Sequence, residues 1–269
     1  MIGIMIAAGA VVVTFLLKGV SPVILINLPA IAIVLAGTFG ATIGSFGMAD
    51  FLRFPKLAAI AMKSYRSQAM VRRQQLVAFA ERARREGLLA LESDIEGVDD
   101  AFLKRGLQMV IDGLEPEVVE EVLALEIEAM KRRHARGALM FGAMAGYAPT
   151  FGILGAVMGL IAVMAHLSEP EKLGSGIQVA FIATLLAVGI ANILFMPISM
   201  ALKARSAEEV VERQMALAGI LAVQAGDNPR IVAQKLDSFI DPKVLAAGLK
   251  VAAGSAAAAT AAASQAEAA

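Results

Sequence analysis

The 269-residue sequence has no cysteine, only two histidines and no net charge. Without cysteine the chain can form no disulfide bond and has no thiolate chemistry. The histidines, His134 and His166, are isolated in the sequence and too few for a metal site. A net charge of zero gives no overall basic field of the kind that nucleic acid binding favours. We therefore expect no metal, no cofactor and no nucleic acid partner.

Charge is also missing from four long apolar segments. Hydrophobic residues make up 58% of the chain and charged residues only 18%. No Asp, Glu, Lys or Arg occurs within about residues 1–17, 22–48, 138–165 and 176–202. A helix of about 17–25 apolar residues can cross a bilayer. The sequence predicts an all-α, polytopic membrane protein with four transmembrane helices, of which the first is close to the short limit. No basic region precedes the first segment, so we do not expect a cleaved signal peptide.

Basic residues near the ends of these segments predict the orientation in the membrane. They follow the second segment, precede the third and follow the fourth, whereas the other two connections have few of them. Because Lys and Arg are enriched in cytoplasmic loops, both termini are expected in the cytoplasm. The expected divisions are transmembrane helices 1 and 2 (1–49), a cytoplasmic helical region (50–137), transmembrane helices 3 and 4 (138–203), cytoplasmic C-terminal helices (204–253) and a disordered Ala-rich tail (254–269).

The polar regions also favour helices. Residues 58–86 contain strong helix formers without internal proline or glycine, and Gly87 is suited to end that helix. Further helices are expected over 99–114, from Pro116 into the third apolar segment, and over 206–225 and 229–236. We find no strand pattern, no phosphate-binding glycine loop and no pairing of a nucleophile with a base. An enzyme is not expected.

Glycines, prolines and one threonine distinguish the apolar segments. Gly40 and Gly44, like Gly155 and Gly159, are four residues apart and share a helix face, which either packs closely or lines a passage. Pro149 and Pro197 each free a backbone carbonyl, which produces a kink or faces water or an ion. Thr184 lies in the middle of an otherwise apolar run.

The absence of charge within these segments poses a choice about function. Ion paths usually need an ionisable group inside the membrane. This chain supplies none in its apolar segments. Either it is a membrane scaffold without ion flux, or a second protein contributes the carboxylate.

Four segments together resemble a known family. They are Leu28–Ala41 with its proline start and Gly-Thr pair, Arg84–Glu92 with Gly-Leu-Leu-Ala-Leu-Glu, Ala148–Leu160, and Gly219–Arg230. In this order they resemble the MotA-type flagellar stator subunits of the MotA/TolQ/ExbB proton channel family, over roughly residues 1–240.

The resemblance implies a bacterial inner-membrane protein that forms a pentamer around two copies of a MotB-type partner, whose single span carries the titrating aspartate. Proton flow would then drive torque on the rotor switch protein FliG. By residue match, Arg84 and Glu92 contact the rotor. The expected ion path is lined by Pro149, Thr150, Ala156, Thr184 and Pro197.

The resemblance also bears on the choice of ion. Ala156 stands where sodium-driven relatives have a threonine, so proton coupling is expected. An ExbB/TolQ-like energy-transducing subunit is the alternative within the same family, although those chains have three spans and a different N-terminal layout.

Overall fold

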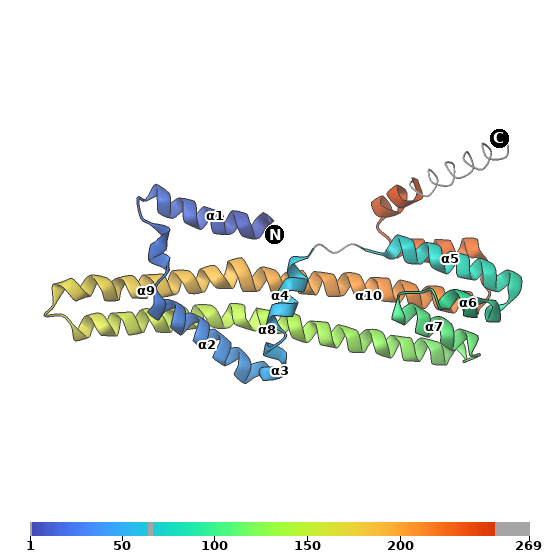
Figure 1. Ribbon diagram of the computed structural model, residues 1–269, viewed down its shortest axis with the longest axis horizontal. Helices are drawn as coiled ribbons and strands as arrows, with labels where there is room; N and C mark the ends of the chain where they lie inside the picture. Colours follow the sequence, from blue (N-terminus) through green and yellow to red (C-terminus); the bar gives the residue numbers. More distant parts are fainter. Residues whose placement is uncertain (1, 64–66, 251–269) are drawn as a thin grey trace. The chain divides into compact units, whose positions relative to one another are not determined.

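The computed structural model describes residues 2–63 and 67–250, and every regular element within them is helical (Figure 1). The chain divides into two units, described separately here. One is formed by Met1–Tyr65 and Arg132–Ser206, and the other by Arg66–Lys131 and Ala207–Ala269. Two long helices, α8 (Pro116–Ala165) and α10 (Met196–Gln224), contribute residues to both. The expectation of an all-α fold is confirmed for the described residues.

The first unit contains the apolar helices. Asn27 begins α2, because its side-chain oxygen accepts a hydrogen bond from the Ala30 N–H at 3.1 Å, and Gly47 ends α2 at a φ of +83°. From α9 the chain continues through a π-helical turn, η3, directly into α10. Besides parts of α8 and α10, the elements are α1 (Ile2–Leu17), η1 (Pro22–Leu25), α2 (Leu28–Phe46), α3 (Met48–Phe51), α4 (Phe54–Met62), α9 (Pro170–Ile190) and η3 (Ala191–Phe195).

Three helical segments of the described chain are long and apolar enough to cross a membrane. They are α2, the apolar part of α8, and the run that extends from α9 into α10. The first predicted span is α1, an apolar helix of only 16 residues. Its crossing of the membrane remains a prediction, and so does the count of four.

Aromatic side chains hold the short helices of this unit against the longer ones. Phe54 of α4 stacks on Phe141 of α8 with ring centroids 5.0 Å apart, and it meets the edges of Phe39 and Phe195 at 5.9 and 6.5 Å. Aromatic pairs at such separations each contribute about 0.5–1.5 kcal/mol beyond their buried area. This cluster therefore joins α2, α4, α8 and η3.

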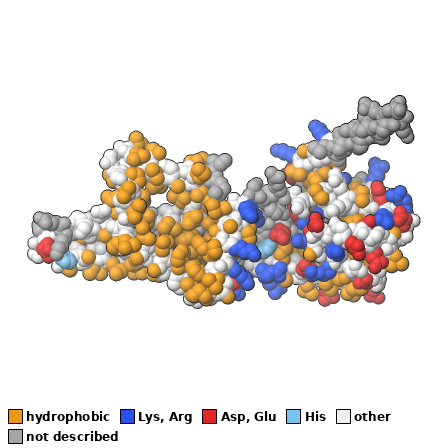
Figure 2. All heavy atoms as spheres, viewed as in Figure 1, with side chains coloured by type: hydrophobic (Ala, Val, Ile, Leu, Met, Phe, Trp, Pro, Cys, Tyr) orange, Lys and Arg blue, Asp and Glu red, His pale blue; other side chains and the backbone are white. Residues whose placement is uncertain are grey.

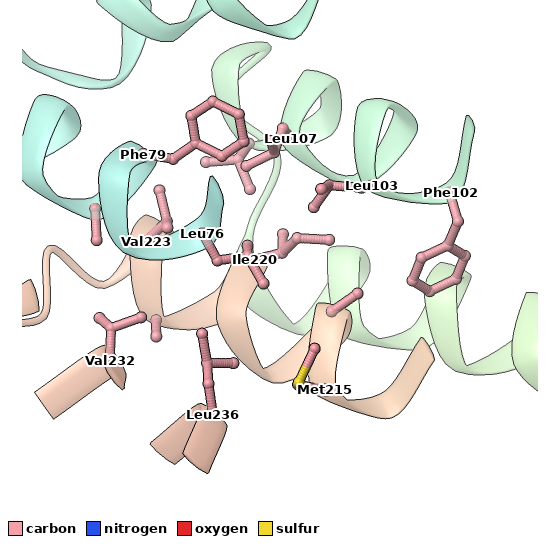
Figure 3. Packing of buried hydrophobic residues seen from close by; sticks show 14 of the residues in the cluster. Leu76, Phe79, Phe102, Leu103, Leu107, Met215, Ile220, Val223, Val232 and Leu236 are labelled. Carbon is pink, nitrogen blue, oxygen red and sulfur yellow. The ribbon is translucent and has the colours of Figure 1, made fainter. Parts of the chain in front are cut away.

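The second unit has its own hydrophobic core (Figure 3). Leu76, Leu103, Leu107 and Ile220 are fully buried there. The contact between α7 and α10 is close, since a Cβ on Gly106 would lie 2.4 Å from Ile220 Cδ1. Besides parts of α8 and α10, its elements are α5 (Ala69–Glu86), η2 (Leu88–Leu91), α6 (Glu92–Ile95), α7 (Ala101–Ile111) and α11 (Pro229–Asp237).

The single helix predicted over residues 58–86 is wrong. Lys63 has an extended backbone and ends α4, and α5 begins only at Ala69. A tertiary contact explains the late start: Glu212 accepts hydrogen bonds from Ser67 Oγ at 2.7 Å and from the Gln68 N–H at 3.1 Å. These bonds hold the two residues outside the helix despite their favourable local sequence.

The other helix predictions are close to the structure. Gly87 ends α5 at a φ of +86°, and α8 runs without a break from Pro116 into the third apolar segment. The helices predicted over 99–114, 206–225 and 229–236 correspond to α7, the end of α10 and α11. The predicted disordered tail lies outside the described residues. The predicted division at 49, 137 and 203 concerns the membrane borders and remains a prediction.

Candidate ion path and rotor-facing surface

Glycines of α8 bring this helix into close contact with α9, which lies alongside it in Figure 1. A Cβ on Gly152 would lie 2.4 Å from the Ala187 Cβ and 3.2 Å from the Ala183 carbonyl oxygen. Small residues allow helices in a membrane to approach in this way. The facing pairs are Gly152–Ala187, Gly155–Ala183 and Gly159–Gly176.

The two predicted glycine stripes differ in their surroundings. Gly155 and Gly159 pack tightly, as one of the two interpretations of their spacing expects. Gly40 and Gly44 of α2 face open space, with no side chain of this unit within 4 Å of a Cβ placed there. Instead Gly37 makes the close contact, because the Phe151 ring lies against it. Close packing is therefore found for the pair in α8 but not for Gly40 and Gly44, for which the lining of a passage remains a prediction.

Thr184 lies beside the glycine contact. Its side chain is half-buried, and its Oγ1 donates a 3.2 Å hydrogen bond to the Ala180 carbonyl one turn earlier. Its Cα is 3.4 Å from the position that a Cβ on Gly152 would take. A threonine bonded to its own helix still keeps lone pairs on its oxygen for a further partner. Thr184 thus offers an oxygen at an otherwise apolar helix contact.

Three predicted ion-path residues of α8 lie around Gly152. Pro149 and Ala156 are half-buried and share a helix face, since they are seven residues apart. Thr150 is exposed, and its Oγ1 donates to the Tyr147 carbonyl at 2.6 Å. Pro149 has no N–H, so the helix loses one backbone hydrogen bond there. The structure therefore brings Thr184 into the neighbourhood of the α8 residues.

Pro197 has a different environment. It follows the π-helical turn η3 and is half-buried. It lines a cavity of about 380 Å³ together with residues of α1 and α4, among them Ile4 and Ala61. Because a proline has no N–H, the helix lacks one backbone donor at Pro197. π-Helical turns within helices often mark functional sites. The sequence indicated the proline but carried no signal for the π turn, and it did not indicate that Pro197 faces α1.

Arg84 and Glu92 lie on either side of a fixed corner in the second unit. Arg84 is in the last turn of α5 and Glu92 begins α6, with Gly87 between them. Arg82 of α5 connects the two sides of this corner, because it pairs with Asp94 of α6 and with Glu86 of α5, the latter at 3.1 Å. The hydrogen bond with Asp94, and to a smaller extent that with Glu86, raises the pKa of Arg82 above its ordinary value.

The two predicted rotor contacts, Arg84 and Glu92, have no partner among the residues that the structure describes. Arg84 and Glu92 are both exposed. Neither makes an ion pair or side-chain hydrogen bond with any residue that the structure describes. Their charges are therefore available to another protein.

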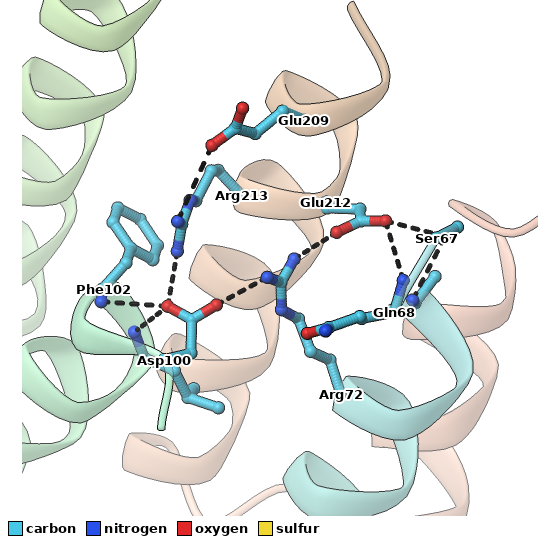
Figure 4. A network of polar contacts seen from close by, with 10 residues as sticks. Ser67, Gln68, Arg72, Asp100, Phe102, Glu209, Glu212 and Arg213 are labelled. Carbon is cyan, nitrogen blue, oxygen red and sulfur yellow. Dashed lines mark hydrogen bonds and ion pairs between the residues drawn. The ribbon is translucent and has the colours of Figure 1, made fainter. Parts of the chain in front are cut away.

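A buried charge network in the second unit was missed by sequence reasoning (Figure 4). Arg72 of α5 binds Asp100 at 2.6 Å and Glu212 at 2.5 Å, and Arg213 binds Asp100 at 2.5 Å. Burial by itself would raise the pKa of Asp100. The hydrogen bond and charge of Arg213 and the charge of Arg72 outweigh it, and the pKa lies below its ordinary value. Sequence spacing gives no indication that these residues meet, since they come from three separate segments.

Comparison with known proteins identifies the family. A sequence model described as the MotA/TolQ/ExbB proton channel family matches residues 94–215. The chain is 41% identical over 247 residues to "Motility protein A" of Bacillus subtilis strain 168, and the match covers 90% of each chain. It is 36% identical over 219 residues to "Motility protein A" of Borreliella burgdorferi, covering 81% of this chain and 84% of that protein.

Solved structures agree with this result. The fold matches the flagellar MotAB stator complex from Bacillus subtilis with a TM-score of 0.83 at 41% identity, covering 90% of this chain and 95% of that one. It matches the C. jejuni MotAB structure with a TM-score of 0.85 at 30% identity, covering 90% and 94%. On identity, coverage and fold, the chain belongs to the MotA/TolQ/ExbB proton channel family.

Proposed function

We propose that this chain is a stator subunit of a bacterial flagellar motor and that its helices α8 and α9 form the wall of a proton path. The observation that carries the proposal is a closely packed glycine–alanine helix pair, free of charged side chains over residues 138–165 and 176–202, with the Thr184 hydroxyl beside its contact. Such a wall suits passage of an ion but lacks a group to carry it.

The missing carboxylate belongs to a second protein in this proposal. The two solved relatives are titled as MotAB complexes, which supports a MotB-type partner for this chain. We propose that five copies of the chain surround two copies of that partner and that the partner's single span carries the titrating aspartate. Thr150, which is exposed on α8, would then face this span together with Pro149 and Ala156.

Protons are the proposed coupling ion. A sodium ion requires several oxygen ligands, and Ala156 offers no side-chain oxygen at its place on α8. Swimming should therefore continue when sodium is removed and stop when the proton gradient is collapsed. Motility that depends on sodium and survives collapse of the proton gradient would contradict this part of the proposal.

We propose that the stator acts on the rotor in the cytoplasm through the corner between α5 and α6, which carries Arg84 and Glu92. Both side chains are exposed and without an internal partner in the described chain, and Arg82 and Gly87 hold the backbone between them. An exposed cation and an exposed anion on a rigid corner suit a charged partner. We propose FliG as that partner. The proposed placement is the inner membrane with both termini in the cytoplasm.

Replacing Thr184 tests the ion path against a scaffold without ion flux. The Thr184→Val chain is expressed with its MotB-type partner in cells that lack their own stator. We expect the variant to co-purify with the partner, because its hydroxyl makes only one hydrogen bond to its own helix. We expect the torque of tethered cells to be lost.

Thr14→Val is the matched control, since Thr14 of α1 makes the same bond to a carbonyl four residues earlier, at 2.8 Å. Its cells should swim normally. A Thr184→Val complex that assembles and still drives normal rotation would favour the scaffold.

A further inference from the structure

A small basic cavity lies in the first unit, away from the proposed ion path. Its volume is about 100 Å³, and it lies between α8 and the segment of α3 and α4. Arg133 and Arg136 come from α8, and Asp50 and Arg53 from the α3 segment. Leu57 and Met140 form an apolar floor. Three guanidinium groups and one carboxylate leave a formal charge of +2 around it.

The three arginines differ in what they already bind. Arg136 pairs with Asp50 and donates to the Phe46 carbonyl at 3.4 Å. Arg53 lies 3.7 Å from Asp50 and is 67% exposed, so its charge is only weakly compensated. Arg133 is exposed and makes no ion pair or side-chain hydrogen bond with the described residues. One carboxylate is therefore shared by two arginines, and the third has donors to offer.

The cavity lies where the charged sequence becomes apolar. Ala138, the first residue of the third charge-free segment, lies two residues after Arg136, the last charged residue that α8 contributes to the cavity. Figure 2 shows basic side chains gathered where the apolar surface of this unit ends. In a membrane protein this is the depth of the lipid headgroups, and basic pockets at this depth bind anionic headgroups.

We propose that this cavity binds the phosphate of an anionic phospholipid, with Arg133 and Arg53 as the donors. Arginine suits phosphate because its planar N–H groups can bond two oxygens at once. The apolar floor of Leu57 and Met140 suits the start of the acyl chains. A volume of about 100 Å³ admits a compact phosphate but not a whole lipid, whose chains would extend along the apolar helices. The proposal depends on membrane residence and not on ion conduction.

Lipid titration of the purified stator complex tests the proposal. The full chain with its membrane partner, in neutral detergent, receives phosphatidylglycerol or phosphatidylcholine with identical acyl chains, and bound lipid is counted by native mass spectrometry. Both lipids carry the phosphodiester, but the choline cation of phosphatidylcholine is repelled by the formal charge of +2 around the cavity. We expect phosphatidylglycerol to bind about tenfold more tightly, which corresponds to about 1.4 kcal/mol. Equal affinity for the two lipids would overturn the proposal.

Two substitutions separate a built site from general surface attraction. Arg133→Gln should remove the preference for phosphatidylglycerol. Lys56→Gln removes one charge from an exposed position beside Leu57 that does not line the cavity, and it should preserve the preference. A general attraction to basic residues would lower affinity equally in both variants and would contradict the proposal.

A gain of affinity excludes misfolding as the explanation. Asp50→Asn removes the one carboxylate of the cavity, so phosphatidylglycerol should bind more tightly. Unchanged or weaker binding would count against the assigned position. Inorganic phosphate is the last probe: if millimolar phosphate displaces the lipid, the cavity is a site for free anions and the lipid assignment is wrong.

Discussion

At the scale of single residues, Gly152 sets how closely α8 and α9 approach. An added Cβ would lie 2.4 Å from one side chain and 3.2 Å from a backbone oxygen of α9, and a backbone atom cannot move aside as a flexible side chain can. We expect Gly152→Ala to destabilise the chain by roughly 1–3 kcal/mol, the usual range for overpacking. The lowered thermal unfolding midpoint of the purified complex measures it.

Gly146 of the same helix is the control for Gly152. Among the described residues, no neighbouring helix comes within 4 Å of a Cβ built there. Gly146→Ala should leave the midpoint unchanged or raise it slightly, because alanine favours a helix over glycine by about 1 kcal/mol. Equal loss in both variants would show that the contact with α9 does not set the requirement for glycine.

Asp100 is expected to make the stability of the second unit sensitive to acid. Its pKa in the folded chain lies below the ordinary value of 3.8, because Arg213 and Arg72 outweigh the effect of burial. A depressed pKa adds stability that is complete above the ordinary value and is lost as the pH falls through the folded value. The thermal midpoint should therefore fall below about pH 3.8, and this part of the fall should be absent in Asp100→Asn. An identical acid profile in the variant would contradict the assignment.

At the scale of elements, Arg72 joins three helices. It extends from α5 to Asp100, which caps α7, and to Glu212 of α10. Breaking a buried ion pair from one side destabilises by about 3–5 kcal/mol, since the remaining charge loses its partner. We expect Arg72→Met to lower the unfolding midpoint by roughly 10 °C.

Arg85 of α5 provides the comparison for Arg72. Its side chain is exposed and makes only a 3.5 Å bond to the Glu81 carbonyl. Arg85→Met should change stability by less than about 0.5 kcal/mol, as most surface substitutions do. If both variants unfolded at the same temperature, the network would have no measurable role in joining the helices.

At the scale of the whole molecule, the orientation in the membrane can be tested because the chain has no cysteine. Single cysteines are placed at Ser21, Ser93 and Ser168, which are all exposed. A maleimide that cannot cross membranes should label Ser21→Cys and Ser168→Cys from outside spheroplasts. Ser93→Cys should react only after permeabilisation. If Ser21→Cys also required permeabilisation, α2 would not cross the membrane in the predicted way, and the count of four spans would be wrong.

The sequence by itself determined the features that depend on neighbouring residues. Charge-free runs predicted apolar helices, because transfer into lipid depends on local composition. Gly87 and Pro116 placed helix ends correctly, since the chain ends a helix where its backbone cannot continue. The absence of an ionisable group in the apolar segments, which leaves either a scaffold or a partner that brings the carboxylate, also needed no coordinates.

The tertiary structure alone decided the features that depend on residues distant in the sequence. Glu212 delays the start of α5, the Phe151 ring lies against Gly37, and Arg72 meets acids from two other segments. The position of Pro197 against α1 belongs to the same group. In each case at least one of the partners is more than a hundred residues away, so no local pattern could reveal the contact.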